Sequence, residues 1–275
     1  MSAPARAGVS ARGAFLGTGA RGIVAGAAPP AIGLALLLAL GSLVVRAFAD
    51  VWRAPAMLPQ QWGWRGFRAA FVDGGGAASA LATSVAVAAV STAIALVLAW
   101  PAARVLGERR FRHPAPVFLL LAMPLLVAPY AVGAGLSEWF LRLGMSGTLA
   151  GLALAHLTVV LPYAVLLLLS GFGPELRGLE EMGRAAGLSA SQRLRWVTIP
   201  ALRPTLAAAA LMAFLVSWSQ YGTSLAIAPT RPTLPVLLLP FIGSDPQVAA
   251  ALSLVFLAPA LLALVVAVRA IRSAT

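Results

Sequence analysis

The chain has 275 residues, of which 60% are hydrophobic and only 10% are charged, whereas an ordinary soluble domain has roughly 25% charged residues. The net charge is +12, but the arginines are dispersed among apolar runs and form no basic stripe with stacking aromatics, which argues against nucleic-acid binding. The chain contains no lysine and no cysteine, which excludes a lysine-bearing phosphate loop for ATP, thiolate metal sites and disulfides.

Six uncharged runs are each at least the roughly 20 residues that a membrane-spanning helix needs. They cover residues 23–45, 74–103, 114–137, 143–174, 204–230 and 246–268. The sequence therefore predicts an all-α polytopic membrane protein with six transmembrane helices.

The N-terminal part divides into three predicted segments. Residues 1–22, rich in Ala, Gly and Arg, are expected to form a mobile cytoplasmic tail. Residues 23–49 are interpreted as a retained first span, because the apolar run is longer than the 7 to 15 residues of the hydrophobic region of a signal peptide. Residues 50–76 are predicted to form an outer interfacial segment, anchored by Trp52, Trp62 and Trp64. Residues 77–275 contain spans two to six, with kinks expected in the third at Pro124 and Pro129.

The distribution of arginines predicts the orientation, because positively charged loops stay in the cytoplasm. With six spans, both termini lie on the same side. If that side is the cytoplasm, only six of the twenty arginines lie outside, namely Arg46, Arg53, Arg65, Arg68, Arg142 and Arg231. Both termini and the loop at residues 172–204 are therefore expected in the cytoplasm of a bacterial cell, with the chain in its inner membrane.

The loop at residues 172–204 has the features of a docking element. Ser189 and Gln192 have the spacing of a capping box, so a second helix is expected to start after Gly187 and to stop near Pro200. A glycine at the end of the preceding helix permits a positive φ there. Arg193 and Arg195 are predicted to point away from the apolar side of the second helix, toward lipid phosphates or a partner.

The same loop resembles the cytoplasmic signature of the permease subunits of binding-protein-dependent ABC importers. That signature reads E-A-A-x-x-x-G, nine residues, then I-x-L-P. The matching positions in this chain are Glu181, Gly187, Val197, Ile199 and Pro200. The chain departs from the pattern at Met182 and Gly183, where the family has alanines.

The resemblance implies a type I ABC importer permease fold, covering the chain from about residue 81 to the C-terminus. It implies that two permeases, of the same or different chains, form the pathway, that an extracytoplasmic binding protein delivers the substrate, and that separate ATPase subunits bind the ATP. This chain would then have no cofactor and no catalytic residue. Glu181 would contact the ATPase, and Gly187 and Ser189 would make the docking helix rigid. Residues 58–67 resemble, more weakly, permeases of the polyamine, thiamine and ferric-iron group. This weaker resemblance implies a polyamine, thiamine or ferric iron as substrate.

The fifth predicted span carries a polar stretch inside an apolar helix. Ser217, Gln220, Tyr221 and Ser224 recur at helical spacing, so they are predicted to share one face that lines the substrate pathway, with helix packing as the alternative.

His113 and His156 have no carboxylate cluster nearby, which argues against a metal site. His156 is interpreted as a neutral histidine that is bonded to a neighbouring helix.

Two other functions fit a polytopic chain. An ion- or proton-coupled secondary transporter would require a buried acidic or basic residue inside a span, and the six runs contain none apart from His156. A membrane scaffold without transport activity would leave the spacing from Glu181 to Pro200 unexplained.

Overall fold

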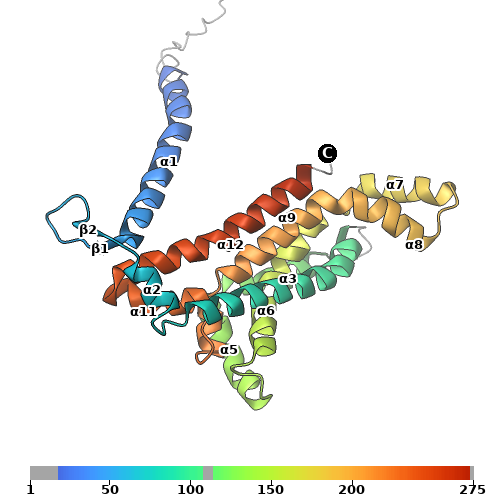
Figure 1. Ribbon diagram of the computed structural model, residues 1–275. Coiled ribbons are helices and arrows are strands. Elements are labelled where there is room, and N and C mark those ends of the chain that lie inside the picture. Colours follow the sequence, from blue (N-terminus) through green and yellow to red (C-terminus); the bar gives the residue numbers. More distant parts are fainter. Residues whose placement is uncertain (1–17, 108–113, 273–275) are drawn as a thin grey trace, which may run out of the picture.

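The computed structural model describes residues 18–107 and 114–272, which are mainly helical (Figure 1). The first half contains α1 (Thr18–Ala47), β1 (Ala49–Val51), β2 (Gln61–Trp62), α2 (Arg65–Phe71), α3 (Ala77–Gly107), α4 (Pro114–Leu126) and α5 (Pro129–Arg142). The second half contains α6 (Leu149–Leu169), α7 (Pro174–Ala185), α8 (Ala190–Arg193), the π-helical segment η1 (Leu194–Thr198), α9 (Ile199–Trp218), α10 (Gly222–Ile227), α11 (Leu234–Ser244) and α12 (Pro246–Arg272). Residues 1–17 of the predicted tail and His113 lie outside the described residues.

The described helices support a membrane protein but do not reproduce the predicted count of six spans. Four helical segments are long and apolar enough to cross a membrane: Ala77–Gly107, Leu149–Leu169, Ala190–Trp218 and Pro246–Arg272. A fifth span is obtained if α4 and α5 are counted as one bent pair. In α1, the described apolar part Ile32–Ala47 is a shorter helix.

The third predicted span is broken into α4 and α5, which meet at an angle of 97°. Pro129 is the first residue of α5, and Ala128 before it has ψ 133°, outside the helical region. A proline disfavours helical geometry at the residue before it, and this explains the break. Pro124 lies inside α4 without ending it. The predicted kink at Pro129 is confirmed.

The fifth predicted span differs from its prediction at both ends. The second helix of the loop at residues 172–204 was expected to stop near Pro200. It does not stop there, because α8, η1 and α9 continue as one segment from Ala190 to Trp218. Ile199 and Pro200 are the first two residues of α9 and directly follow the π-helical turns of η1. A proline is tolerated in the first turn of a helix, where its missing N–H is not needed. The helix then ends at Trp218, and the short α10 resumes at Gly222.

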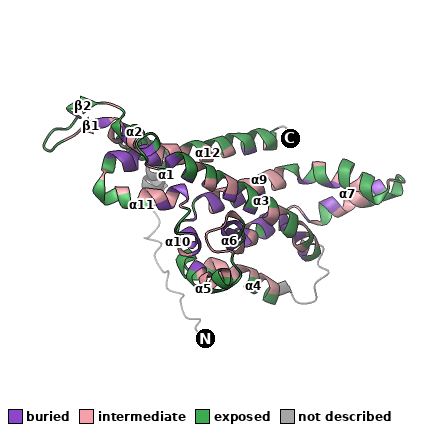
Figure 2. Ribbon diagram, turned by 60° about the horizontal axis from the view of Figure 1, so that its bottom comes forward, coloured by how far each residue is buried: buried purple, intermediate pink, exposed green. Residues whose placement is uncertain are grey.

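The core lies where α3, α6 and α9 pack together (Figure 2). The contact surfaces of α3 and α9 are rich in alanine; Ala95, Ala99, Ala209 and Ala213 are fully buried. Small residues let helix backbones approach closely, and close packing is the main attraction between helices in a bilayer. A second cluster joins α12 to this core, where Trp218 stacks against Phe256 with ring centroids 5.1 Å apart.

The predicted outer segment contains a small β-ribbon that the sequence pattern did not indicate. β1 and β2 pair antiparallel, with Ala49 opposite Trp62. Strands of three and two residues are too short to show an alternating pattern. α2 then lies against the beginning of α12, since a Cβ at Gly66 would come within 2.9 Å of the carbonyl oxygen of Gln247.

Candidate functional site

A charged elbow projects from one end of the helix bundle (Figure 1). We define the elbow as α7, the turn at Gly187, α8 and η1. Gly187 has φ +82°, the Leu188 N–H donates to the carbonyl of Gly183, and the Gly187 N–H donates to the carbonyl of Arg184, both at 3.0 Å. This pair of bonds is a Schellman motif, which requires a left-handed residue at the position of the glycine. The predicted glycine turn is confirmed.

The start of the second helix is fixed by side-chain bonds. The Ser189 hydroxyl accepts from the Gln192 N–H at 3.3 Å, and the Ser189 N–H donates to the Gln192 side chain at 2.8 Å, so the predicted capping box is present. Arg193 does not extend toward lipid, because its guanidinium donates to the Leu188 carbonyl at 2.7 Å. That bond connects α8 to the turn after Gly187 and so stabilises the turn.

A carboxylate that the sequence analysis did not select connects the elbow to the bundle. Glu180 accepts from the Arg104 guanidinium of α3 at 2.8 Å and from the Thr198 hydroxyl of η1 at 2.6 Å. Its side chain is only 13% exposed. Helical spacing places Glu180 on the same face as Leu176 and Gly183, which are buried. This helical spacing could have identified Glu180 from the sequence as an inward-facing residue.

The opposite face of α7 is exposed and carries the residues that fit a docking role. Glu181 is exposed, as are the apolar side chains of Leu179 and Met182, at 42% and 62%. Gly183 faces inward, and a Cβ there would lie 3.5 Å from Val197. An alanine would therefore make an ordinary contact, and the glycine is not needed for close approach.

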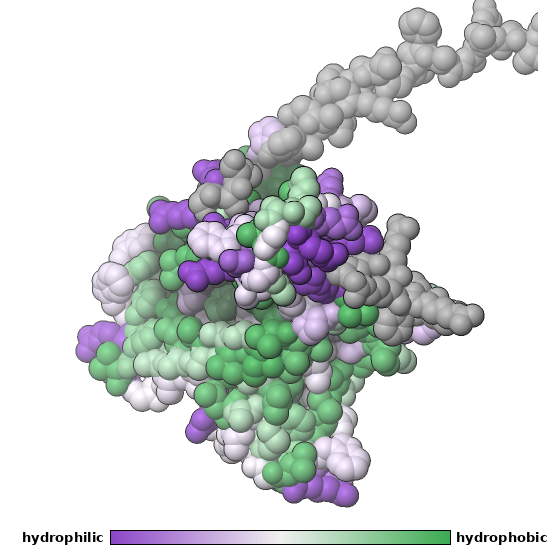
Figure 3. Space-filling model, turned by 90° about the vertical axis from the view of Figure 1, so that its right-hand side faces the viewer, coloured by the Kyte–Doolittle hydropathy of each residue, from purple (hydrophilic) through white to green (hydrophobic). Residues whose placement is uncertain are grey.

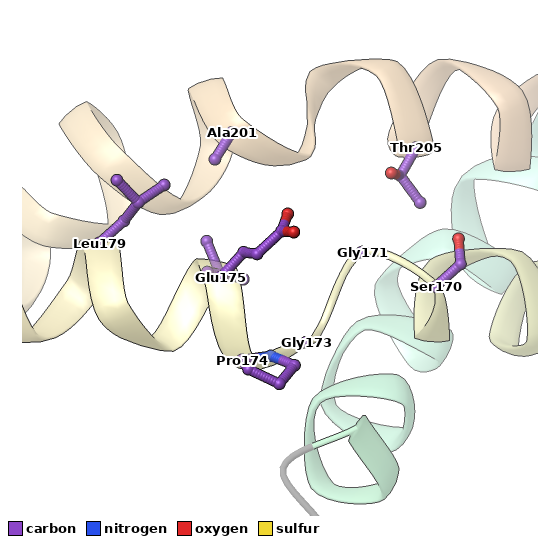
Figure 4. Close-up of a pocket in the computed structure, with 9 residues that line it drawn as sticks. Ser170, Gly171, Gly173, Pro174, Glu175, Leu179, Ala201 and Thr205 are labelled. Carbon is purple, nitrogen blue, oxygen red and sulfur yellow. The ribbon is translucent and has the colours of Figure 1, made fainter.

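Hydrophilic side chains gather at the elbow, in contrast to the mainly hydrophobic surface below it (Figure 3). A pocket of about 540 Å³ lies between the base of α7 and α9 (Figure 4). The side chain of Glu175 extends from α7 into this space, opposite Ala201 and Thr205. The base of α7 is therefore not packed directly against α9, which increases the importance of the bonds at Glu180.

A second polar cluster lies inside the bundle. His156 of α6 bonds through Nδ1 to the Ser217 hydroxyl and through Nε2 to the Ser224 hydroxyl, both at 2.9 Å. The Ser217 hydroxyl also bonds to Ser91 of α3 at 2.9 Å. His156 thus joins the end of α9 to α10 across the break between them, which confirms the interpretation of a histidine bonded to neighbouring helices.

The four polar residues of the fifth span do not share one helical face, so the predicted face is wrong, while their role in lining a pathway stays a prediction. The helix breaks between Ser217 and Gln220, and Tyr221 precedes the first turn of α10. Ser217, Gln220 and Ser224 are buried, whereas Tyr221 is 52% exposed. The run of polar residues interrupts the helix where a continuous periodic face was expected.

The break after α9 meets the break between α4 and α5. Thr223 donates to the carbonyl of Pro129 at 3.1 Å, and a Cβ at Gly222 would lie 2.8 Å from the Tyr130 nitrogen. A pocket of about 230 Å³ opens at this junction, lined by Ala128, Pro129, Tyr130, Ser219, Gln220, Tyr221 and Gly222. Irregular backbone at membrane depth is tolerated where it is buried in protein or lines a water-filled cavity.

Comparison with known proteins relates this geometry to transport. No family model matches the chain. The molybdenum transport system permease protein ModB of Mycobacterium bovis is 32% identical over 202 residues, which cover 67% of this chain and 76% of that protein. The trehalose transport system permease protein SugB of Mycobacterium tuberculosis is 28% identical over 61% of this chain and 62% of its own length. The molybdate/tungstate transport system permease protein WtpB of Pyrococcus abyssi is 26% identical over 60% and 66%.

These relatives are transport permeases and not enzymes. The similarity to these relatives and the long apolar helices of this chain both support a multi-pass inner-membrane protein. The loop signature at Glu181–Pro200 and the relatives therefore point to the same conclusion: the chain belongs to the permease subunits of type I ABC importers.

Proposed function

We propose that the elbow is the surface on which a separate ATPase subunit docks and through which it moves the membrane helices. The observation that carries this proposal is the combination of a rigid frame and an exposed face. The Schellman turn at Gly187 and the capping box at Ser189 fix the shape of the elbow. Glu181 and Met182 stand outward, and exposed apolar side chains next to charges are typical of protein contact surfaces.

Isolation of the tagged chain in mild detergent, followed by mass spectrometry, tests the docking proposal. We expect the wild-type chain to recover an ATPase, and Glu181→Ala to recover several-fold less, because removing a charged contact at such an interface costs about 1–3 kcal/mol. Glu175→Ala is the matched control, since Glu175 lies on the same helix but faces the pocket toward α9. Equal recovery from the two variants would contradict docking through Glu181.

The proposed orientation places the elbow in the cytoplasm, and the absence of native cysteine makes this testable. Met57 is 92% exposed, in the loop between β1 and β2 at the end of the molecule opposite the elbow. We expect Met57→Cys to react with an impermeant maleimide from outside intact cells, and Ser191→Cys to react only after the inner face is opened. The reverse pattern would place the elbow outside and remove the ATPase from its reach.

We propose that the pathway passes the junction of the two helix breaks. Interrupted helices at membrane depth are typical of transporter substrate sites, because they present backbone groups that a continuous helix would conceal. Gln220, Tyr221 and the first residues of α5 line the pocket there. Ser217 and Ser224 are proposed to support this lining through His156 and not to contact substrate directly, because both are almost completely buried.

For the substrate, we propose a small oxyanion of the molybdate type. None of the seven lining residues is a carboxylate, so a polyamine, thiamine or ferric iron would meet no negative charge, and the relatives give these three substrates no support. The N-terminus of the 14-residue α5 opens at the same pocket, and a helix N-terminus favours an anion. The relatives named for molybdenum agree with an anionic solute.

The partner subunits and the division of this chain into segments are proposed because the chain belongs to the ABC permease family. ABC permeases act in general with ATPase and binding-protein partners, and we propose a second permease, of the same or a different chain, across the pathway. Within this chain, residues 77–275 would form the permease domain, with the coupling loop at 172–204. Residues 23–49 would form the first span, residues 50–76 an outer segment, and residues 1–22 a cytoplasmic tail.

A further inference from the structure

The end of α1 meets the beginning of α12 at the end of the bundle opposite the elbow (Figure 1). Residues of this region line two neighbouring hollows. The first, which we term the headgroup pocket, has a volume of about 250 Å³ and is lined by Arg46, Arg53, Arg65 and Asp245 among others. The second, which we term the acyl groove, has a volume of about 550 Å³ and lies between α1, α11 and α12. Arg46 and Pro246 line both hollows, so the polar and apolar spaces adjoin each other.

The carboxylates of the headgroup pocket already have partners. Arg65 donates to both oxygens of Asp245, at 2.6 and 3.0 Å, and these hydrogen bonds lower the pKa of Asp245 below its ordinary value. Asp50 accepts from the Arg65 N–H at 3.2 Å and from the Gln247 side chain at 2.6 Å. Asp245 is therefore paired with Arg65, whereas both bonds to Asp50 fall on Oδ1 and come from uncharged groups.

Two further guanidinium groups line the same pocket without an anionic partner among residues 18–107 and 114–272. That of Arg46 lies 5.4 Å from the centre of the Trp52 ring, and that of Arg53 is exposed. Three arginines face two aspartates in this pocket, which leaves one positive charge. One phosphodiester group would neutralise it.

The acyl groove has the form that a hydrocarbon chain requires. Leu40, Leu43, Leu238 and Ile242 line it together with small residues of α12. Its α1 wall runs from Ala39 to Arg46, a rise of about 10 Å in a helix, which suits part of one acyl chain. The arginines stand at the end of this wall, where α1 leaves the apolar region.

The surrounding tryptophans place this end of the molecule at the membrane surface. Trp62 and Trp64 are 59% and 62% exposed, and Trp52 packs under Arg46. Tryptophan is enriched at the level of lipid headgroups. The headgroup pocket therefore lies at the depth of phosphates, and the acyl groove continues toward the hydrocarbon.

We propose that the headgroup pocket and the acyl groove together bind one anionic phospholipid. Arg46 and Arg53 hold the phosphate, and one acyl chain occupies the groove between α1 and α12. Because three arginines and two aspartates give the pocket a net positive charge, it favours an anionic headgroup over a zwitterionic one. Phosphatidylglycerol is therefore preferred to phosphatidylethanolamine. The bound lipid would fasten α1 to the bundle, independently of the transported substrate.

Native mass spectrometry of the purified transporter complex tests this site. The complex is delipidated and then supplied with equal amounts of phosphatidylglycerol and phosphatidylethanolamine. We expect the wild type to retain one phosphatidylglycerol per chain. Arg46→Gln and Arg53→Gln are each expected to reduce that retention about fivefold, the usual contribution of one basic residue near an anionic headgroup. Arg53 lies in an exposed loop, so its replacement does not disturb the core.

Two controls separate this site from general lipid contact. Arg68→Gln removes the same charge from an exposed position in the same outer segment that does not line the pocket, and it should leave retention unchanged. Ser42→Phe, which fills the groove from α1, should reduce retention without a change of charge. Equal retention of the two lipids, or equal losses in Arg53→Gln and Arg68→Gln, would overturn the proposal. So would a disulfide from Ser42→Cys to a cysteine on a second permease, because a protein would then occupy the groove.

Discussion

Replacing Glu180 with alanine is expected to uncouple the transporter while leaving its ATPase bound. Glu180 is the acceptor that joins Arg104 of α3 to Thr198 of η1, at 2.8 and 2.6 Å. The pocket between the base of α7 and α9 reduces the direct packing there, so that Leu176 is the buried α7 side chain closest to Glu180 along the helix. Loss of such a partly buried pair of charged hydrogen bonds costs about 1–3 kcal/mol. A moving ATPase would then tilt α7 without displacing α3 and α9.

The measurement is ATP hydrolysis by the assembled complex, with and without the loaded binding protein. We expect Glu180→Ala to copurify with the ATPase and to lose most of the stimulation. Thr198→Val removes the hydroxyl that donates to Glu180 at 2.6 Å and lies 3.3 Å from the Arg193 carbonyl, and it should lose part of the stimulation. Glu181→Ala, one residue away on the exposed face, should instead recover several-fold less ATPase. If Glu180→Ala retained full stimulation, or if it also lost the ATPase, the distinction between an anchoring and a docking carboxylate would be wrong.

The contrast between Glu180 and Glu181 shows what the sequence could and could not predict. The turn at Gly187 and the capping box at Ser189 follow from local chemistry, since a positive φ and a short side-chain bond depend on neighbouring residues only. Glu180 depends on Arg104, which lies 76 residues away. The helical spacing of α7 could mark Glu180 as facing inward, but it could not identify the arginine that meets it.

The helix breaks were harder to predict for a different reason. The break at Pro129 could be predicted, because a proline disfavours helical geometry at the residue before it, which is Ala128. At the end of α9, Ser217 and Gln220 continue the helical spacing of the sequence, yet the chain departs from the helix between them. The bonds from His156 to Ser217 and Ser224 stabilise that departure. They come from a different helix, so periodicity within the span could not reveal them.

The junction of the two breaks is expected to be highly sensitive to side-chain volume, and Gly222 is one of its tightly constrained positions. A Cβ at Gly222 would lie 2.8 Å from the Tyr130 nitrogen and 3.1 Å from its Cα. Real Cβ atoms do not approach a backbone so closely, so Gly222→Val must separate α10 from α5. Such overpacking costs about 1–3 kcal/mol and occasionally more. The separation would also break the bond from Thr223 to Pro129 and deform the pocket.

We expect Gly222→Val to lower the melting temperature in detergent and to abolish uptake of labelled molybdate, the type of substrate proposed above, by proteoliposomes that contain the complete transporter. Gly135→Val is the matched control, because a Cβ at Gly135 of α5 meets nothing within 4 Å. A readout that does not depend on the substrate uses Ser219→Cys, an exposed position on the pocket wall. Its reaction with a water-soluble thiol reagent should change several-fold when Gly222→Val is added and remain constant when Gly135→Val is added. If the two valine variants behaved alike in all three measurements, the close approach of α5 and α10 would have no role in the pathway.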